Sequence, residues 1–352
     1  MKAAVFHGQR DLRVDDVPEP ETRPGGVKIE VGWCGICGSD LHEYLAGPIF
    51  IPPSGSPHPL TGEEMPIVLG HEFGGRVVEV GDGVSRVEVG DRVAVEPIVY
   101  CGECPECRRG AYNLCRKLGF YGLSGGGGGF SEFAVVPEYM AHRLPDELSD
   151  EESALVEPVA VGLHAVHQAG FTSGQTAIVF GAGPIGAATV QCLRASGASL
   201  VVVAELSETR KEMARKIGAD AVIDPQEEDV VEAVRRLTDG VGVNASFDAA
   251  GVQETLNTAF HTTARGGKVV NVAIWEQSIE LDPNDMVLSE VEVVGSIAYA
   301  NEFPATMALM KDDRVNAGEL VTKRISLSEI VEEGFEELAA NRDRHVKILV
   351  RP

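Results

Sequence analysis

The sequence has few cysteines, few aromatic residues and few lysines for its length. It contains seven cysteines in 352 residues, aromatic residues make up 6%, and nine lysines stand against 21 arginines. So sparse a cysteine content excludes a disulfide scaffold, in which covalent cross-links replace a hydrophobic core. The length instead fits about two domains, each with a core of its own.

Positive charge is also scarce, because 54 acidic residues oppose 30 basic ones and give a net charge of −24. Nucleic-acid binding and docking on anionic membranes both need a basic surface, so the composition argues against these two classes. Two explanations of the acidity stay open. A carboxylate-rich, lysine-poor surface fits a protein that works in concentrated salt, and it also occurs in ordinary acidic cytosolic enzymes.

The sequence also lacks a convincing membrane span. The stretch from Thr176 to Leu193 carries no charge, but it has a Gly-Pro break at its centre and is followed by Arg194, which argues against a span. The first residues, MKAAVFHGQRDLRV, lack the apolar core and cleavage pattern of a secretory signal. We therefore expect a soluble, cytoplasmic protein without a membrane partner.

Four of the seven cysteines fall in one short segment, CGECPECRRGAYNLC, as Cys101, Cys104, Cys107 and Cys115. Linked C-x-x-C steps let the sulfurs converge on one point, and four thiolates with no open position make a closed structural zinc site. Disulfides need an oxidising compartment, and a thioredoxin-like pair needs only one C-x-x-C. A zinc knuckle on nucleic acid could use the adjacent arginines, but the overall charge opposes it. We predict structural zinc.

Two motifs upstream, GICGSDLHEY and LGHEFGG, predict a second metal site with an open position. Cys37 and the adjacent pair His71 and Glu72 are residue types that a catalytic zinc takes, with about three protein ligands and one place left for substrate. Glu157, in LVEPVAVG, is a further carboxylate candidate. Each fragment alone is weak evidence for a metal site, since a lone cysteine or histidine is usually an interior residue. We interpret Cys34 in that way, as a small buried side chain. Together, and in this order, the fragments are specific evidence for a metal site.

A nucleotide site is indicated by an apolar strand, a glycine turn and a helix in TAIVFGAGPIGAATVQCLRASG. A second strand at 200–204 ends in Glu205, at the spacing that a dinucleotide-binding fingerprint requires. The glycines permit the tight turn, the approach of the pyrophosphate and close helix packing, and the helix N-terminus faces the phosphates. The motif supplies Gly181, Gly183, Pro184, Ile185 and Gly186.

The acidic residue after the second strand favours NAD over NADP. Glu205 would accept hydrogen bonds from the adenosine ribose hydroxyls and would repel a 2′-phosphate. Arg210, five residues on, could instead accommodate NADP or flank the adenine. Gly251, after the strand at 244–248, and Val272 and Ala273, at the end of the strand at 268–272, lie at the carboxyl edge, where ligand sits in such sheets.

The pattern of elements divides the chain into three parts. After Glu157, strands at 177–180, 200–204, 221–223, 244–248 and 268–272 alternate with helices, which predicts a doubly wound parallel sheet. Before Glu157, short β-rich runs are punctuated by glycine and proline. We expect a β-rich zinc domain over residues 1–157, a dinucleotide domain over 158–294, and a C-terminal segment, 295–352, that returns to the first domain.

This constellation resembles the zinc-containing medium-chain dehydrogenases, and the resemblance covers the whole chain. It rests on Cys37, the His71–Glu72 pair, the four-cysteine loop, GAGPIG and Glu205. The resemblance implies a GroES-like catalytic domain with two zinc ions, one catalytic and one structural, and a Rossmann domain that binds NAD. A glutamate as third ligand, here Glu157, is similar to the polyol and diol branch, and the loop from Tyr44 to Glu72 is similar to that of the 2,3-butanediol dehydrogenases.

The resemblance also implies a reaction, the oxidation of a secondary alcohol or vicinal diol with hydride passed to NAD⁺. The best match is 2,3-butanediol, oxidised to acetoin. Zinc on Cys37, His71 and Glu157 would lower the pKa of the alcohol. The proton would then leave through the hydroxyl of Ser39 and through His42, which stand at the positions of the family's relay.

Several points stay open at this level. Asp40 would orient His71, and Glu72 could bind or exchange at the zinc. A sorbitol, glucose or threonine dehydrogenase of the same family is an alternative, and so is a protein that binds NAD and zinc without turnover. The family further implies a homo-oligomer, a tetramer or a dimer, formed through the edge of the Rossmann sheet.

Overall fold

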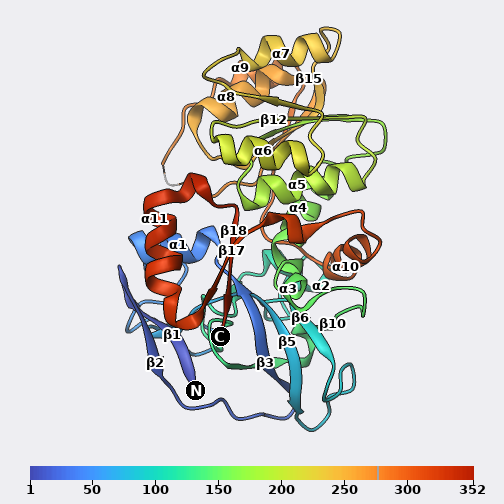
Figure 1. Cartoon of the computed structure of the whole chain (residues 1–352). Helices are drawn as coiled ribbons and strands as arrows, with labels where there is room; N and C mark the ends of the chain where they lie inside the picture. The colour runs from blue at the N-terminus through green and yellow to red at the C-terminus, as the bar shows by residue number, and fades with distance from the viewer. Residues whose placement is uncertain (276) are drawn as a thin grey trace. The chain divides into compact units, whose positions relative to one another are not determined.

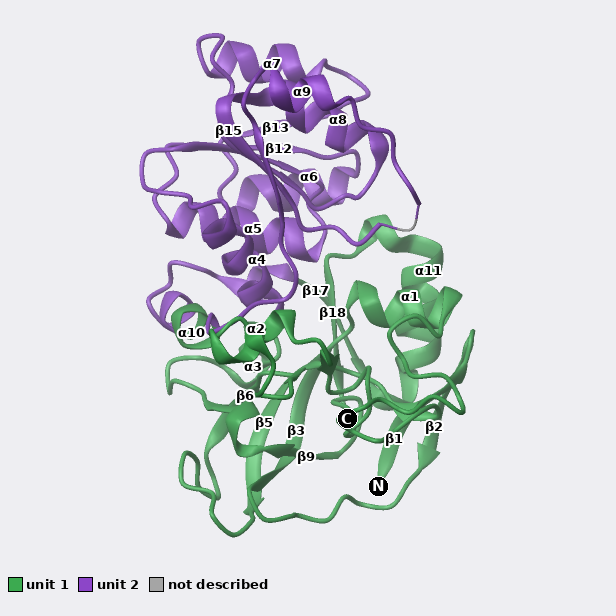
Figure 2. Cartoon of the chain, turned by 180° about the vertical axis from the view of Figure 1, so that it is seen from behind, with its two compact units in different colours: residues 1–157, 303–307, 321–352 green, residues 158–302, 308–320 purple. Residues whose placement is uncertain are grey.

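The computed structural model describes residues 1–275 and 277–352, which form two compact units (Figure 2). The first unit comprises residues 1–157, 303–307 and 321–352, and the second comprises residues 158–302 and 308–320. The chain passes between them at 157/158, 302/303, 307/308 and 320/321. The three-part division expected from the sequence stays a prediction.

Strands dominate the first unit (Figure 1). Its largest sheet has the order β10-β6-β5-β3-β18-β17, with β9 also paired to β3, and a smaller sheet has the order β2-β1-β4. The strands of the unit are β1 (Lys2–Gly8), β2 (Asp11–Asp16), β3 (Gly26–Gly35), β4 (Ile67–Val68), β5 (Glu72–Val80), β6 (Arg92–Val95), β7 (Ile98–Val99), β8 (Gly119–Phe120), β9 (Phe133–Pro137), β10 (Ala141–Arg143), β17 (Val321–Ser326) and β18 (Lys347–Arg351).

The strand β3 organises this sheet because it pairs with three others. It runs antiparallel to β5 along most of its length, to β9 over its first half, and to β18 at its last residues. Apolar side chains on these strands are fully buried and form one core, which includes Ile29, Cys34, Phe73 and Ile348. The interpretation of Cys34 as a small buried side chain therefore agrees with the structure.

Helices in the first unit are short. They are α1 (Gly38–Ala46), α2 (Pro105–Arg108), α3 (Asp150–Ser153) and α11 (Glu337–Asn341), with a π-helical segment at Ile330–Glu336. Two more helices, α4 (Val156–Gln168) and α10 (Phe303–Lys311), have residues in both units. Among the described residues, no helix is long and apolar enough to cross a membrane.

The second unit is built on a parallel sheet of six strands in the order β13-β12-β11-β14-β15-β16. The order reverses between β11 and β14, which is the crevice where ligands bind in doubly wound sheets. The strands are β11 (Thr176–Phe180), β12 (Leu200–Ala204), β13 (Ala221–Ile223), β14 (Val243–Asp248), β15 (Thr263–Asn271) and β16 (Glu292–Gly295). The connecting helices are α5 (Pro184–Ala195), α6 (Glu208–Lys216), α7 (Val230–Leu237), α8 (Gln253–Thr262) and α9 (Pro283–Val287).

Candidate functional site

Three potential metal ligands from distant parts of the sequence meet in the first unit. The ligand atoms of Cys37, His71 and Glu72 all lie within 4.8 Å of one another. Strand pairing explains the meeting, because Gly35, the last residue of β3, lies opposite Glu72, the first residue of β5. Cys37 then caps the N-terminus of α1. Thiolate, imidazole and carboxylate are the donors that zinc takes in proteins, so this set fits a zinc ion.

His71 has an oxygen near each of its ring nitrogens. Its Nδ1 lies 3.3 Å from Oδ1 of Asp40, and its Nε2 lies 3.3 Å from the hydroxyl of Ser39. The other carboxylate oxygen of Asp40 accepts the backbone N–H of Cys37 at 2.9 Å. Burial alone would lower the pKa of His71, but Asp40 and Cys37 outweigh burial and hold that pKa well above its usual range. Asp40 therefore lies against both the ring of His71 and the backbone of Cys37.

Glu72 forms a buried ion pair that the sequence interpretation did not foresee. The Nζ of Lys347, in β18, lies 2.7 Å from Oε1 and 2.5 Å from Oε2 of Glu72, and it also donates to the carbonyl of Ile36 at 3.2 Å. Both side chains are almost completely buried, at 1% and 0% exposure. Burial would lower the pKa of Lys347, but Glu72 and Cys37, and further Glu157, raise it. One cation thus balances several acidic groups.

A sequence signal for Lys347 did exist. It is the lysine in the otherwise apolar run VKILV, and a lysine is rarely buried in such a strand unless it is paired. Close packing at the Glu72 carboxylate also explains a glycine, since a Cβ on Gly35 would lie 2.2 Å from Oε2 of Glu72.

Glu157 and His42 lie outside the three-residue cluster. Glu157 is buried in the first turn of α4, at 6% exposure, and it acts electrostatically on Lys347. His42 is partly buried on α1, three residues after Ser39. The structure thus brings Cys37, His71 and Glu72 together, and the ligand role expected for Glu157 stays a prediction.

The four cysteines of the CGECPEC segment form a second cluster. The ligand atoms of Cys101, Cys104, Cys107 and Cys115 lie within 4.8 Å of one another, and all four are free thiols. The sulfur of Cys104 lies 3.4 Å from that of Cys107, and the sulfur of Cys115 lies 3.5 Å from that of Cys101. These separations are too long for disulfide bonds and suit sulfurs around one ion.

Backbone groups prepare this cluster for negative charge. The N–H groups of Cys101, Cys104, Cys107 and Lys117 all point at cysteine sulfurs, at 3.3 to 3.5 Å. The N–H groups of Glu103 and Cys104 lower the pKa of Cys101 to about 6, while burial, chiefly, raises that of Cys107 to about 12. A divalent cation would remove the cost of gathering four thiolates, so the donor set fits a structural zinc.

Glu96 connects the four-cysteine segment to the sheet. Its carboxylate accepts the Tyr112 hydroxyl at 2.6 Å and lies 2.7 Å from Nε2 of His142, which belongs to β10. Tyr112 lies between Cys107 and Cys115 in sequence, and its ring stacks on that of Tyr100 with centroids 4.9 Å apart. The segment is therefore held at the sheet by a buried carboxylate as well as by its own sulfurs.

In the second unit the glycine turn connects β11 to α5. Gly181 has a φ of 84°, a left-handed conformation that favours glycine. A Cβ on Gly186 would lie 1.9 Å from the carbonyl oxygen of Gly181, so the helix can approach the turn only if this residue is glycine. Gly183 caps α5 without a side-chain hydrogen bond, and Pro184 and Ile185 begin the helix. The N–H groups at the N-terminus of a helix suit a phosphate.

The side chain of Glu205 is hydrogen-bonded to this turn. One carboxylate oxygen accepts the N–H of Ala182 at 2.7 Å, and the other accepts those of Leu206 and Ser207 at 2.8 and 2.9 Å. Each carboxylate oxygen has two lone pairs, so the side chain retains acceptor capacity toward a ribose. Arg210 lies near the turn as well, because a Cβ on Gly183 would be 3.9 Å from its Nη1.

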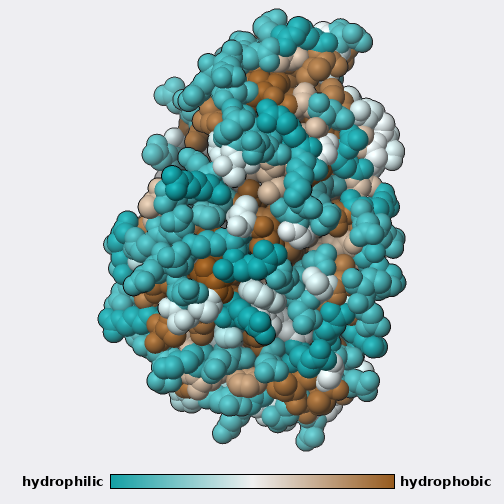
Figure 3. Space-filling view, viewed as in Figure 1, coloured by the Kyte–Doolittle hydropathy of each residue, from teal (hydrophilic) through white to brown (hydrophobic). Residues whose placement is uncertain are grey.

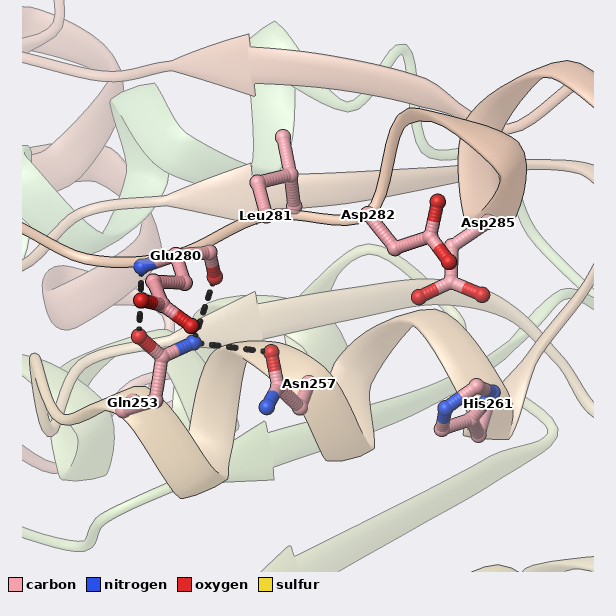
Figure 4. Close-up of a pocket in the computed structure, with 7 residues that line it drawn as sticks. All are labelled: Gln253, Asn257, His261, Glu280, Leu281, Asp282 and Asp285. Atoms are coloured by element: carbon pink, nitrogen blue, oxygen red, sulfur yellow. Dashed lines mark hydrogen bonds between the residues drawn. The ribbon is translucent and has the colours of Figure 1, made fainter.

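A polar hollow elsewhere in the second unit contains none of the predicted site residues (Figure 4). There the amide of Gln253 exchanges two hydrogen bonds of 2.7 Å with the backbone of Glu280 and donates to Asn257 at 2.9 Å. Hydrogen bonds thus join three of its lining residues, Gln253, Asn257 and Glu280. The hollow is lined by Gln253, Asn257, His261, Glu280, Leu281, Asp282 and Asp285.

Comparisons with known proteins agree with this geometry. Two family models match the chain, "Alcohol dehydrogenase GroES-like domain" over residues 23–146 and "Zinc-binding dehydrogenase" over residues 184–312. The chain is 50% identical to the (R,R)-butanediol dehydrogenase of Bacillus subtilis over 100% of both chains. The crystal structure of 2R,3R-butanediol dehydrogenase from the same organism superposes with a TM-score of 0.94 over 100% of this chain and 99% of that one.

More distant relatives match over a similar length. The sorbitol dehydrogenase of Bacillus subtilis is 35% identical over 100% of this chain and 97% of its own. A zinc-binding dehydrogenase of Sinorhizobium meliloti 1021, solved bound to NADP, is 33% identical with a TM-score of 0.90, over 100% of this chain and 99% of that one.

The chain belongs to the zinc-binding dehydrogenase family. It is therefore an oxidoreductase of the zinc-dependent alcohol dehydrogenase type, with zinc and a nicotinamide coenzyme as cofactors. The family resemblance predicted from the sequence is confirmed, and so is the fold, a GroES-like domain joined to a Rossmann domain with a parallel sheet.

Proposed function

We propose that this enzyme oxidises the vicinal diol 2,3-butanediol to the hydroxyketone acetoin, with NAD⁺ as the hydride acceptor, and catalyses the reverse reduction. Each turnover converts diol and NAD⁺ into acetoin, NADH and one proton. The observation that carries the proposal is the cluster of Cys37, His71 and Glu72 in a chain that is 50% identical, over its full length, to a butanediol dehydrogenase.

Each cluster would hold one zinc ion. Cys37, His71 and a carboxylate, Glu157 or Glu72, would hold the catalytic ion, and the four cysteines the structural one. A catalytic zinc supplies Lewis acidity toward the alcohol oxygen and lowers the pKa of the alcohol. The 3.3 Å contact between Ser39 and Nε2 of His71 places a hydroxyl at the cluster, so Ser39 would accept the substrate proton.

Other residues of the chain would move that proton and orient the ligands. His42, partly buried three residues further along α1, would pass the proton from Ser39 to solvent. Asp40 would hold the His71 ring through Nδ1. The ion pair with Lys347 engages both carboxylate oxygens of Glu72, so that an exchange of Glu72 onto the metal would require the pair to open.

We infer that NAD is the preferred coenzyme. Glu205 lies at the end of β12 beside the glycine turn, where a 2′-phosphate would meet like charge. Gly181, Gly183 and Gly186 would take the pyrophosphate together with the start of α5 at Pro184 and Ile185, and Gly251, Val272 and Ala273 would contact the other half of the coenzyme. The position of Arg210 near Gly183 keeps NADP as the alternative to be measured.

We propose that two copies associate through β16 to give a dimer, or a tetramer built from dimers. β16 is an edge strand of the parallel sheet, and apolar residues on and near it are exposed, with Val293 at 45%, Val287 at 70% and Leu288 at 69%.

Val293→Arg should reduce the mass measured by light scattering, whereas Val89→Arg, at an exposed site of the first unit, should not. An unchanged mass for V293R would contradict the proposed interface.

We also propose that the enzyme works in the cytoplasm. Its four clustered thiols are free, and thiolate sites of this kind persist in reducing compartments.

The test of the reaction is NADH formation by the zinc-replete protein with the isomers of 2,3-butanediol, sorbitol, glucose, threonine and ethanol, and NADH consumption with acetoin. Preference for butanediol and acetoin would support the proposal. Preference for sorbitol would favour the second candidate, which rests on the 35% identical relative. Cys37→Ser should abolish turnover and leave NADH binding intact. No turnover by wild type with bound zinc and NADH would indicate a non-catalytic protein.

A further inference from the structure

Asp248 is a buried carboxylate that the proposed mechanism does not use. It is the last residue of β14 and has no exposed surface. One carboxylate oxygen, Oδ1, accepts three hydrogen bonds, from the N–H groups of Ala250 and Gly251 at 3.1 Å each and from the hydroxyl of Thr255 at 3.0 Å. The other oxygen, Oδ2, is buried and has no hydrogen-bond partner among the described residues.

The backbone of the same residue holds a second loop. The carbonyl oxygen of Asp248 accepts the N–H groups of Val272 and Ala273, at 3.0 and 3.1 Å. The two loops also touch, because a Cβ on Gly251, whose φ is 71°, would lie 2.9 Å from the Cβ of Ala273. One residue therefore sets the loop after β14 and the loop after β15.

The sheet topology shows which part of a dinucleotide these loops would meet. The strand order is β12-β11-β14-β15. The ribose-binding acid Glu205 follows β12, and the glycine turn for the pyrophosphate follows β11. A dinucleotide laid across the carboxyl edge thus places its adenosine half over β12 and its nicotinamide half over β14 and β15.

We infer that Asp248 is a positioning residue for the coenzyme, which holds the backbones of 250–251 and 272–273 in the arrangement that the nicotinamide half requires. The inference rests on the proposed binding of NAD. Burying a carboxylate with one oxygen unpartnered is costly, and burial raises the pKa of Asp248. The three donors need an acceptor oxygen at the position of Oδ1. None of them needs that oxygen to carry a negative charge.

The test compares four variants of the zinc-replete enzyme by the dissociation constants of NADH and of AMP, a probe for the adenosine half. Asp248→Ala should weaken NADH roughly 10-fold or more and leave AMP within about twofold. Asp248→Asn should stay within about threefold of wild type for NADH, because the Asn oxygen can accept the same donors. Thr255→Val removes a donor that Oδ1 shares with the carbonyl of Val252, which lies 2.9 Å from the same hydroxyl, and should weaken NADH by about two- to fivefold.

Thr258→Val is the matched control, because Thr258 lies on the same helix and donates to the carbonyl of Glu254, and within the described residues the hydrogen bonds of the Asp248 carboxylate do not involve it. It should bind NADH as wild type does. Equal loss of NADH and AMP affinity in D248A would indicate general loosening and overturn the inference. So would a D248N variant as weak as D248A, because the charge would then be what matters.

Three further outcomes have a defined meaning for this inference and for the proposed function. If D248A does not fold, the NADH dissociation constants of T255V and D248N still test the inference. Wild-type affinity of T255V for NADH would overturn it. If wild type itself binds no NADH, the proposed function fails and the inference fails with it. If wild type binds NADH and D248A binds it equally well, only the inference is overturned.

Discussion

At the residue scale, the ion pair between Lys347 and Glu72 is the feature of the site that depends most on a single side chain. Both groups are almost completely buried, so removing either partner leaves an uncompensated charge in the interior. Glu72 itself belongs to the cluster with Cys37 and His71, and Cys37 also acts electrostatically on Lys347. Loss of the pair should therefore affect both folding and metal retention.

Lys347→Met should lower the free energy of unfolding by about 3–5 kcal/mol and reduce the zinc that the purified protein retains. Lys323→Met is the matched control on the neighbouring strand β17, where the lysine pairs with the more exposed Glu333, and it should cost about 1 kcal/mol or less. Urea unfolding and metal analysis measure both effects. Equal stability of the two variants would show that the buried pair contributes little.

A second single-residue prediction concerns pH. Burial alone would raise the pKa of Glu302, but hydrogen bonds from His164 and His167, at 2.9 and 3.3 Å, lower it to about 2. Since the folded pKa lies below the unfolded value of about 4.3, the stabilisation is fully present above pH ~4.3 and is lost as the pH falls toward 2.

Glu302→Gln should therefore cost about 1–3 kcal/mol at pH 7, and the difference from wild type should shrink progressively below pH ~4.3. Unfolding by urea at several pH values, compared between the two proteins, measures this difference. A difference that stays constant down to pH ~2.5 would contradict the assignment of the low pKa.

Residue types with distinctive spacing could be predicted from the sequence, and residues selected by packing could not. Cys37, His71 and the four cysteines carry recognisable patterns, and the structure clusters them. Lys347 is more than 270 residues from Glu72 in sequence, and only the pairing of β18 with β3 brings it near. The run VKILV indicates that Lys347 is paired if it is buried, but no local pattern shows which distant residue is its partner.

At the scale of elements, the four-cysteine segment has two separate supports. Its sulfurs face one another, and Tyr112 bonds to Glu96.

Cys104→Ser removes one ligand and should lower the melting temperature by about 5–10 °C and the zinc content by one ion, with NADH binding retained. Calorimetry and metal analysis test this. A loss of rate at unchanged melting temperature would contradict a structural role.

Strands and helices of the Rossmann sheet were predicted closely because each is a short apolar run or a periodic segment. The strands at 200–204 and 221–223 have the predicted bounds. The start of β15 was not predicted, since the structure begins it at Thr263, five residues before the strand predicted at 268–272. The parallel pairing of β17 with β18, inside a mainly antiparallel sheet, depends on tertiary contacts and has no local signal.

At the scale of the whole molecule, the net charge of −24 is the dominant property. The face seen in Figure 3 is largely hydrophilic, with hydrophobic residues in scattered groups. Mutual repulsion among carboxylates opposes the compact state, and salt screens it over a Debye length of about 10 Å at 0.1 M.

Raising KCl from 0.1 to 2 M should therefore raise the melting temperature and the rate of diol oxidation. Sucrose at equal osmolality is the control for exclusion effects on the protein surface, and it should reproduce only part of the shift. A melting temperature that falls or stays level in KCl would favour the ordinary acidic enzyme over a protein adapted to concentrated salt.

The position of β18 in its sheet has a consequence for synthesis of the protein. β18 follows every other strand in the sequence, yet it lies between β3 and β17 in the sheet. Until β18 has been translated, the end of β3 lacks this neighbouring strand. All strands of the parallel sheet, which ends with β16, precede β18 in the sequence. The coenzyme unit can thus fold first, and the metal-binding unit is completed only when Lys347 leaves the exit tunnel and neutralises Glu72.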